Sequence, residues 1–352
     1  MKKLKQAKDD FSLVVENAFD FFKKSLDEFD KEPKYSVIHF HAGIELIMKA
    51  RLLWEHWTLI LTRPDNANLQ SFRSGDFQSV SIKDAKVRLE SIVQDGLNPA
   101  EYECFLRLSD HRNRMVHFYH PGSAGNKTEL EKIVAEQCLA WYHLSRILKR
   151  WRDQFESYST EIARIDKAMH KHGKYLNTKF GALAAEIKRF KDRGITFTIC
   201  PSCHFESFRE DADDVPILDY ECLVCEVRET GLMIECPQCG EQNRLIGDPW
   251  HRCTKCTHKL NENDVRKFLT KNFVYDKHDP DRSIVAHCEE CEGYETVVQV
   301  NGRWICSLCF AKYNSKEIGR CDCCGSLSTG NLEDSYFRGC VGCDGMASRE
   351  SD

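Results

Sequence analysis

Three residues near the end of one predicted helix carry groups suited to phosphate chemistry. Arg112 and His117 stand five positions apart, and Asn113 directly follows the arginine. An arginine supplies a permanent cation for a phosphate, a histidine can transfer a proton near neutral pH, and an amide can orient either group. On an unbroken helix five positions turn about 140°. The sequence therefore leaves two arrangements open: a bend at the helix end brings the pair into one cleft, or a symmetric dimer places two copies around one cleft.

A second pair fits the same loose spacing. Arg114 precedes His120 by six positions, but the apolar Met115 follows Arg114, whereas the polar Asn113 follows Arg112. We therefore prefer Arg112 with His117. His111 and His120 are then flanking residues that either face solvent or touch a substrate.

The second half of the chain contains eight C-x2-C pairs. Taken consecutively they make four sets of four, with 18, 13, 14 and 15 residues between the inner cysteines. Zinc prefers four tetrahedral thiolate or imidazole ligands, and a two-residue gap lets one turn present two sulfurs at about 2.3 Å from the metal. The pattern predicts four structural zinc ribbons, with the ligands Cys200, Cys203, Cys222, Cys225, Cys236, Cys239, Cys253, Cys256, Cys288, Cys291, Cys306, Cys309, Cys321, Cys324, Cys340 and Cys343.

Three further cysteines stand outside this pattern. Cys323 lies inside Cys321-Asp322-Cys323-Cys324 and is a spare residue that could replace a ligand. Cys104 and Cys138 are expected in the core of the helical part. Redox chemistry is disfavoured for the C-x2-C pairs, because each of them has a partner pair at ribbon spacing.

The Arg112-Asn113-x3-His117 segment resembles the arginine-x4-6-histidine motif of HEPN-superfamily ribonucleases. On the preceding helix Glu45-x3-Lys49 is similar to the Glu-x3-Lys-Arg motif of several members, although Ala50 separates the lysine from the next arginine. The resemblance covers roughly residues 1–150. Without it, Glu45 and Lys49 read as a surface ion pair worth about 0.3–0.5 kcal/mol; with it, they support the arginine or bind RNA.

The resemblance implies an all-α module that dimerises, with two hexapeptides facing each other across one cleft. His117 would move the proton of a ribose 2′-hydroxyl or of the leaving oxygen, Arg112 would stabilise the phosphorane, and Asn113 would orient them. It implies an RNA substrate and no catalytic metal. The family's roles suggest a toxin of a toxin–antitoxin system or an antiphage-defence effector.

Charge and cysteine content change at the same place in the chain. Residues 1–195 carry 33 Lys and Arg against 27 Asp and Glu, residues 196–352 carry 17 against 28, and only two of 19 cysteines precede residue 200. Each four-thiolate zinc site adds about −2 to the formal charge. We therefore expect the ribbons to dock a protein, such as an antitoxin or regulator, rather than a nucleic acid.

Basic residues concentrate between the helical part and the ribbons. Lys167, Lys171, Lys174, Lys188 and Arg189 make this segment either a solvated helix face or a surface that attracts RNA through counterion release. The interleaved aromatic residues are expected in the core.

The predicted fold is an α-helical, HEPN-like bundle followed by small β-rich zinc-ribbon domains. Five segments follow: a helical catalytic domain over 1–150, a basic connecting helix over 151–195, two ribbons over 196–259, a linker with a short helix over 260–287, and two ribbons over 288–352. Apolar periodicity predicts the elements: helices near 1–30, 33–62, 82–95 and 99–119, a polar loop over 63–80, one or two long helices over 127–195, and a short helix near 264–273.

Neither a transmembrane stretch nor a signal peptide is apparent, which predicts a cytoplasmic protein without a membrane partner. The competing hypothesis is a non-enzymatic dimeric scaffold whose ribbons dock a protein or nucleic-acid partner. A third, a ribbon-based transcription or translation factor, predicts a basic ribbon surface and conflicts with the charge counts.

Overall fold

The chain folds into two compact units, each described by itself below. The computed structural model describes residues 2–118, 126–271 and 285–346. The helical unit comprises Met1–Ala185, and the cysteine-rich unit comprises Glu186–Asp352. Among the described residues, no helix is both long and apolar enough to cross a membrane.

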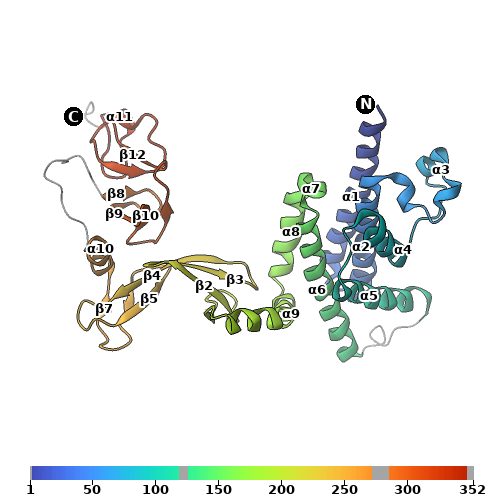
Figure 1. Ribbon diagram of the computed structural model, residues 1–352, viewed down its shortest axis with the longest axis horizontal. Helices are drawn as coiled ribbons and strands as arrows, with labels where there is room; N and C mark the ends of the chain where they lie inside the picture. Colours follow the sequence, from blue (N-terminus) through green and yellow to red (C-terminus); the bar gives the residue numbers. More distant parts are fainter. Residues whose placement is uncertain (1, 119–125, 272–284, 347–352) are drawn as a thin grey trace. The chain divides into compact units, whose positions relative to one another are not determined.

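The helical unit is built from helices joined by short turns (Figure 1). In chain order they are α1 (Lys2–Glu28), α2 (Pro33–Glu55), α3 (Leu69–Ser74), α4 (Ile82–Arg88), α5 (Pro99–His117), α6 (Lys127–Arg150), α7 (Arg152–Phe155), α8 (Ser159–His170) and α9 (Gly173–Asp192). Short 3-10 turns lie at Trp57–Ile60, Pro64–Asn66 and Glu156–Tyr158, and a π turn at Leu89–Val93 follows α4.

Aromatic and polar contacts hold the first helices together. The Phe22 ring of α1 lies 5.3 Å from the Phe40 ring of α2 and 6.0 Å from the Trp141 ring of α6. The buried Gln137 of α6 also donates hydrogen bonds to Ser25 Oγ of α1 and Ser36 Oγ of α2, at 2.9 and 2.8 Å. These bonds satisfy polar groups that would be costly to bury unpaired, and they fix how α1, α2 and α6 align.

Two predictions about helix boundaries were wrong, and local helix end signals explain both. The second helix ends at Glu55 instead of residue 62, because His56 is extended (φ −165°, ψ 140°). The predicted loop over 63–80 contains α3, whose N-cap Asn68 accepts from two backbone N–H groups and whose C-cap Gly75 is left-handed. Both are ordinary helix end signals in a segment too polar to show apolar periodicity.

The predicted long helices over 127–195 are divided into α6, α7, α8 and α9. Breaks occur at Trp151, near Tyr158 and at His172, where the backbone leaves helical geometry or the hydrogen-bond ladder stops. Trp151, Phe155 and Tyr175 are almost fully buried. The breaks therefore lie beside large buried rings, and sequence periodicity alone did not reveal them.

The described part of the cysteine-rich unit contains the end of α9, short strands and two further helices. They are β1 (Phe197–Ile199), β2 (Glu206–Asp214), β3 (Ile217–Cys222), β4 (Arg228–Glu235), β5 (Gln242–Ile246), β6 (His251–Arg252), β7 (Lys259–Leu260), α10 (Glu262–Thr270), β8 (Val285–Cys288), β9 (Gly293–Val300), β10 (Arg303–Cys306), β11 (Lys312–Tyr313), β12 (Ile318–Arg320), β13 (Leu327–Thr329) and α11 (Ser335–Arg338).

The strands form three sheets. Strands β1 to β5 make an antiparallel meander in chain order, β6 and β7 a hairpin, and the third sheet has the order β11-β10-β9-β8-β13-β12. In the third sheet β8 and β13 are parallel, with Ser328 opposite His287. Tight turns therefore connect most neighbouring strands, and these turns carry the cysteine pairs, except Cys340 and Cys343, which follow α11.

One apolar core joins both halves of this unit. Leu232 of β4, Val265 of α10 and Ile305 of β10 belong to a single buried cluster. The segment predicted as a linker, 260–287, thus contributes a core helix that begins at Glu262, close to the predicted start; residues 272–284 lie outside the described part of the chain. The two halves form one packed body because α10 and both sheets bury the same side chains.

Candidate functional site

Helix α5 carries the predicted catalytic residues, and both of its ends are well defined. Asn98 Oδ1 accepts from Glu101 N at 3.0 Å, Glu101 Oε2 accepts from Asn98 N at 2.9 Å, and Pro99 stands at the first helical position. This capping box satisfies backbone donors that a helix start leaves free. Arg150 of α6 pairs with the buried Glu101 at 2.7 Å. The helix ends after His117, where Phe118 leaves helical geometry.

Arg112 and His117 lie on an unbroken stretch of α5. Arg112 Nη1 donates to Asn113 Oδ1 at 2.8 Å, and the arginine is half-buried while Asn113 and His117 are exposed. Because the helix is continuous through His117, the side chains of the pair leave it about 140° apart. Within one copy the bend that the sequence left open does not occur, so both groups meet at one phosphate only if a second copy contributes.

The predicted supporting pair lies on α2 and is more buried than a surface ion pair. Lys49 Nζ donates to Glu45 Oε1 at 2.5 Å and to Ser79 Oγ at 2.8 Å. The side chains of Lys49 and Glu45 are 11% and 26% exposed. Ser79 lies in the segment before α4. The bond from Lys49 therefore joins this segment to α2.

Arg51 takes no part in this pair. It is almost fully buried, donates to Glu55 at 2.6 Å and lies 3.7 Å from Asp95, in the segment before α5. The alanine inserted before Arg51 turns this side chain to another part of the bundle. In this chain the arginine has a structural contact of its own.

His41, which sequence reasoning missed, lies one turn before Glu45 on the same helix. It is 4% exposed, and its Nε2 lies 2.7 Å from Ser109 Oγ of α5. Ser109 Oγ donates to the Phe105 carbonyl at 3.0 Å, so its proton is already used. His41 Nε2 must then carry the proton, which leaves Nδ1 an unprotonated acceptor without a partner among the described residues.

Electrostatics keep the His41 ring neutral. Burial lowers the pKa of His41 to about 4; Glu45 opposes this shift, while Arg112 and Lys49 add to it. His41, Glu45, Lys49 and Arg112 are therefore one interacting group between α2 and α5. The i, i+4, i+8 spacing on α2 was the available sequence signal.

The flanking histidine His111 does not face solvent freely. Its Nε2 lies 2.5 Å from Glu136 Oε2 of α6, and this hydrogen bond lowers the pKa of Glu136. His111 therefore helps to dock α5 against α6. For the alternative pair, Arg114 is exposed and His120 lies outside the described residues.

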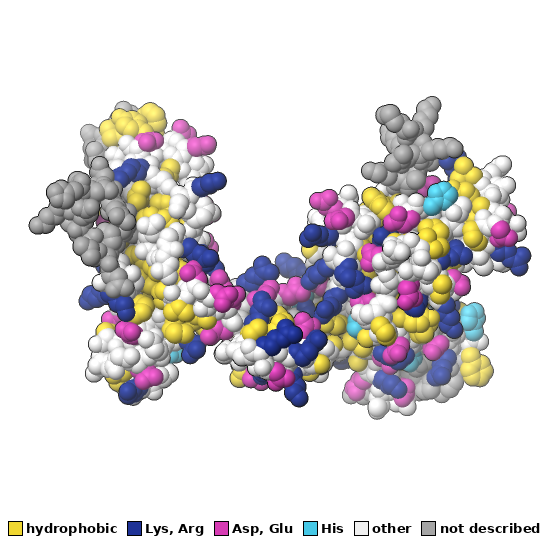
Figure 2. Space-filling view, in the orientation of Figure 1, with side chains coloured by type: hydrophobic (Ala, Val, Ile, Leu, Met, Phe, Trp, Pro, Cys, Tyr) yellow, Lys and Arg dark blue, Asp and Glu magenta, His cyan; other side chains and the backbone are white. Residues whose placement is uncertain are grey.

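The five predicted RNA-binding cations are all exposed: Lys167, Lys171, Lys174, Lys188 and Arg189. The first three belong to the helical unit and the last two to the cysteine-rich unit. In Figure 2, Lys and Arg side chains lie along α9 with acidic ones among them. Their contact with RNA stays a prediction.

The sixteen paired cysteines gather into four clusters that could each hold a metal ion. The memberships follow the consecutive pairing that the sequence predicted. Closest sulfur pairs are 3.5–3.7 Å apart, at Cys200–Cys225, Cys203–Cys222, Cys236–Cys256, Cys239–Cys253, Cys288–Cys309, Cys291–Cys306, Cys321–Cys343 and Cys324–Cys340. Sulfurs about 2.3 Å from one tetrahedral metal stand about 3.8 Å apart, close to this spacing.

Repeated turn geometry positions the sulfurs. In the turn after β1, the His204 N–H donates to the Cys200 carbonyl at 2.9 Å, and His204 is left-handed (φ 62°). Gly240 repeats both features after Cys239, with φ 74°. Each turn directs two thiols of a C-x2-C pair to one side, and the antiparallel pairing of β2 with β3 and of β9 with β10 brings two such turns together in the first and third clusters.

The three remaining cysteines lie outside the four clusters. The last cluster contains Cys324 and leaves out Cys323. Cys104 and Cys138 are fully buried in the helical unit, and burial raises the pKa of each thiol to about 12. They are packed, unreactive core residues.

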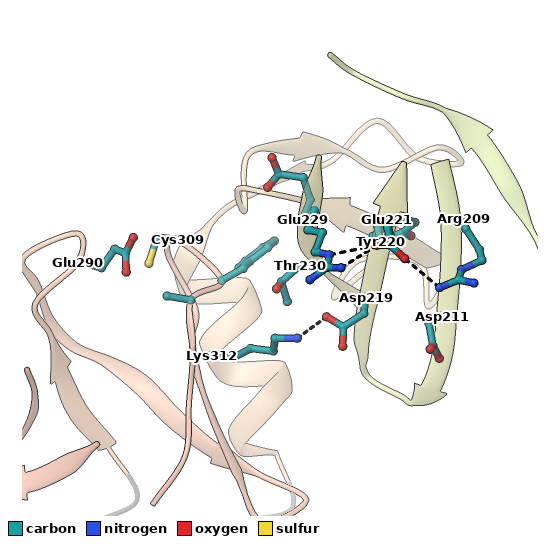
Figure 3. Close-up of a pocket in the computed structure, with 13 residues that line it drawn as sticks. Arg209, Asp211, Asp219, Tyr220, Glu221, Glu229, Thr230, Glu290, Cys309 and Lys312 are labelled. Atoms are coloured by element: carbon teal, nitrogen blue, oxygen red, sulfur yellow. Dashed lines mark hydrogen bonds and ion pairs between the residues drawn. The ribbon is translucent and has the colours of Figure 1, made fainter. Parts of the chain in front are cut away.

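A cavity of about 510 Å³ lies in the cysteine-rich unit between strands β2 to β4 and residues 309–312 (Figure 3). Arg209 and Arg228 both pair with Glu221, at 3.1 and 2.9 Å, and Lys312 pairs with Asp219. The cations are thus used in internal ion pairs. The Lys312–Asp219 pair joins β11, which follows the third cysteine cluster, to β3 of the first sheet.

Comparisons of the chain with protein-family models, with curated proteins and with solved structures found no match. Function is therefore argued from the chain's own geometry.

Proposed function

We propose that this chain is a HEPN-type endoribonuclease that cleaves RNA without a catalytic metal and acts as a toxin or antiphage-defence effector. One observation carries the proposal: the Arg112 guanidinium, held by Asn113, stands near the exposed end of α5 five residues before an exposed His117. A fixed cation and an accessible imidazole are the groups that 2′-hydroxyl attack requires.

The neighbouring polar group of α2 supports this assignment. Glu45, Lys49 and Arg112 each lie close enough to the buried His41 to affect its pKa, so charged groups of α2 and α5 surround one neutral ring. Glu45 and Lys49 are proposed to support the arginine indirectly, on the helix whose His41 contacts α5. The pair is a supporting element, distinct from the residues that contact the phosphate.

In the proposed mechanism His117 removes the proton of a ribose 2′-hydroxyl. The 2′-oxygen attacks the adjacent phosphorus, Arg112 stabilises the charge of the phosphorane, and the bond to the 5′-oxygen breaks. The 5′-oxygen takes up a proton, so the products are a 2′,3′-cyclic phosphate and a 5′-hydroxyl. DNA lacks the nucleophile and remains uncut.

Because α5 is unbroken, the proposed site is shared between two copies of the helical unit. Each phosphate is met by Arg112 of one copy and His117 of the other. A regulator or antitoxin is expected on the acidic part of the cysteine-rich unit, where the formal charge over residues 196–352 is −11.

The metal of the four clusters is proposed to be zinc. Four thiolates with sulfurs 3.5–3.7 Å apart suit a tetrahedral ion and leave no open position for a substrate. When bound, the ion holds two turns together. The cysteines therefore support the fold and have no step in the cleavage.

The test is RNA cleavage by purified full-length chain in the presence of EDTA. Arg112→Ala and His117→Ala should each abolish 2′,3′-cyclic phosphate products, whereas Arg114→Ala on the same exposed turn should keep them. If Arg114→Ala abolishes cleavage and Arg112→Ala does not, the catalytic residues are the alternative pair, Arg114 and His120. Mixing the two inactive variants should restore cleavage, since each mixed dimer regains one complete site; no restoration would contradict a shared site.

The competing proposal is a dimeric scaffold without enzymatic activity. The separation of Arg112 and His117 around one helix favours it, as does a cysteine-rich unit with a single packed core. RNA that stays intact with wild-type protein of full metal content would support the scaffold and exclude the nuclease.

A further inference from the structure

The acidic charge of the cysteine-rich unit is unevenly distributed. Residues 206–235 contain ten Asp and Glu against two Arg, whereas residues 236–260 contain four Lys and Arg against two acids. Exposed charges act over about one Debye length, roughly 8–10 Å. With the charge of about −2 that a bound four-thiolate zinc adds, residues 236–260 are about neutral, in contrast to the strongly acidic residues 206–235.

Two of these cations face each other on the β6–β7 hairpin. Arg252 is opposite Lys259, and both are exposed. The next pair joins His251 to Leu260, which is buried in the core, so alternation directs Arg252 and Lys259 away from the core.

No carboxylate in the described part of the chain pairs with either of these two cations. Arg252 and Lys259 form no ion pair there, in contrast to the nearby Lys255, which lies 3.6 Å from Glu241. Like charges directly opposite on a hairpin are destabilising. An anion bound between them would remove that cost.

An exposed tryptophan lies next to this hairpin. Trp250 is 65% exposed and stands directly before β6, two residues before Arg252. Its backbone N–H donates to Asp248 Oδ1 at 2.8 Å, so the turn is held and that carboxylate is engaged. Figure 1 places β7 at the end of the unit away from the acidic β3.

We propose that the outer face of the β6–β7 hairpin, formed by Trp250, Arg252 and Lys259, binds single-stranded nucleic acid. A base stacks on the indole while the two cations contact flanking phosphates. A duplex hides its base faces, and the Asp and Glu side chains of an acidic peptide offer no aromatic ring for the indole. The site does not depend on cleavage by the helical unit.

The test is fluorescence anisotropy of full-length protein with a short labelled DNA strand and with 2′-O-methyl RNA of the same sequence, neither of which provides a 2′-hydroxyl nucleophile. Trp250→Ala should weaken binding about fivefold or more, and Trp250→Phe less, because stacking is the contact removed. Arg252→Ala with Lys259→Ala should reduce the salt dependence of binding by about 1.4, as expected for two phosphate contacts. The two probes distinguish RNA from DNA as the physiological strand.

Matched controls come from the same unit. Lys255→Ala removes an ion-paired cation of the same cluster, and Tyr294→Ala removes an exposed aromatic ring of β9; neither should change the affinity or the salt slope. A metal content equal to wild type shows that each variant is folded. Photo-cross-linking of a 5-iodouracil strand should label residues 248–260 in the wild type.

Three outcomes would overturn the proposal. One is a change below about twofold with Trp250→Ala. Another is equal binding of a duplex of the same sequence. The third is displacement of the strand by a polyglutamate peptide that binds Trp250→Ala and wild type alike, which would assign the face to an acidic protein. None of these depends on whether Arg112 and His117 cleave RNA.

Discussion

His41 is a buried base kept neutral beside two cations, and its hydrogen bonding explains why. The Ser109 hydroxyl donates its hydrogen bond to a backbone carbonyl. His41 therefore donates to Ser109 through Nε2 and keeps a lone pair on Nδ1. Protonation would bury a second charge next to Arg112. At the residue scale, the group around Arg112 therefore depends on one imidazole remaining uncharged.

This predicts a specific dependence of stability on pH. The folded-state pKa of about 4 lies below the ordinary value of 6.5, so the contribution of His41 is fully present above pH 6.5 and is lost as pH falls toward 4. The free energy of unfolding should fall by about 3 kcal/mol over this range. The His41→Gln variant should not show this fall. Urea unfolding of the full chain at several pH values measures it, with His117→Gln, at an exposed ring, as the control. Parallel pH curves for wild type and His41→Gln would contradict the prediction.

At the scale of elements, α1 and α2 pack so closely that a glycine is required at their contact. A Cβ on Gly43 would lie 2.5–2.8 Å from three ring carbons of Phe22. Phe22 is fully buried and also touches Trp141, so its ring has no space to move. The position of α2, and with it the Glu45–Lys49 pair, depends on this contact.

Gly43→Ala should therefore destabilise the protein by about 1–3 kcal/mol, the usual effect of overpacking. Gly181→Ala is the matched control, because a Cβ there meets nothing within 4 Å in the middle of α9. Alanine should stabilise that helix by about 0.5–1 kcal/mol. Thermal unfolding of both variants gives the comparison; equal effects would show that Phe22 yields to the new methyl group.

At the scale of the whole molecule, the two units are stabilised by different means. The helical unit has a large aromatic core, whereas the cysteine-rich unit adds four cysteine clusters to its apolar core. Small β-rich domains commonly need such metal sites for stability. Removal of the metal should therefore unfold the cysteine-rich unit and leave most of the helical signal in circular dichroism.

Adjacent cysteines provide the sharpest metal experiment. Cys324→Ser should lower the metal content from four ions per chain to three, and Cys323→Ser should leave it at four, because the last cluster contains Cys324. A colorimetric zinc-release assay measures both. The opposite result would place Cys323 in the cluster.

Several features were predictable because their causes are local. The knuckle turns need only a C-x2-C spacing and one left-handed residue, so the membership of the four clusters followed from the sequence. The segment of α5 followed from apolar spacing and from Pro99. In contrast, α3 was missed because its caps, Asn68 and Gly75, lie in a polar segment.

The amino-acid sequence by itself determined the cysteine partners, the helical character of the first half and the placement of Arg112 and His117 on one helix. Tertiary structure alone decided that Lys49 contacts Ser79, that His41 is neutral and that Arg252 and Lys259 face outward together. Spacing along the chain fixes geometry over a few residues, within one turn or helix. Burial, protonation and local charge depend on which distant segments pack together. A net charge summed over a whole segment does not contain that information.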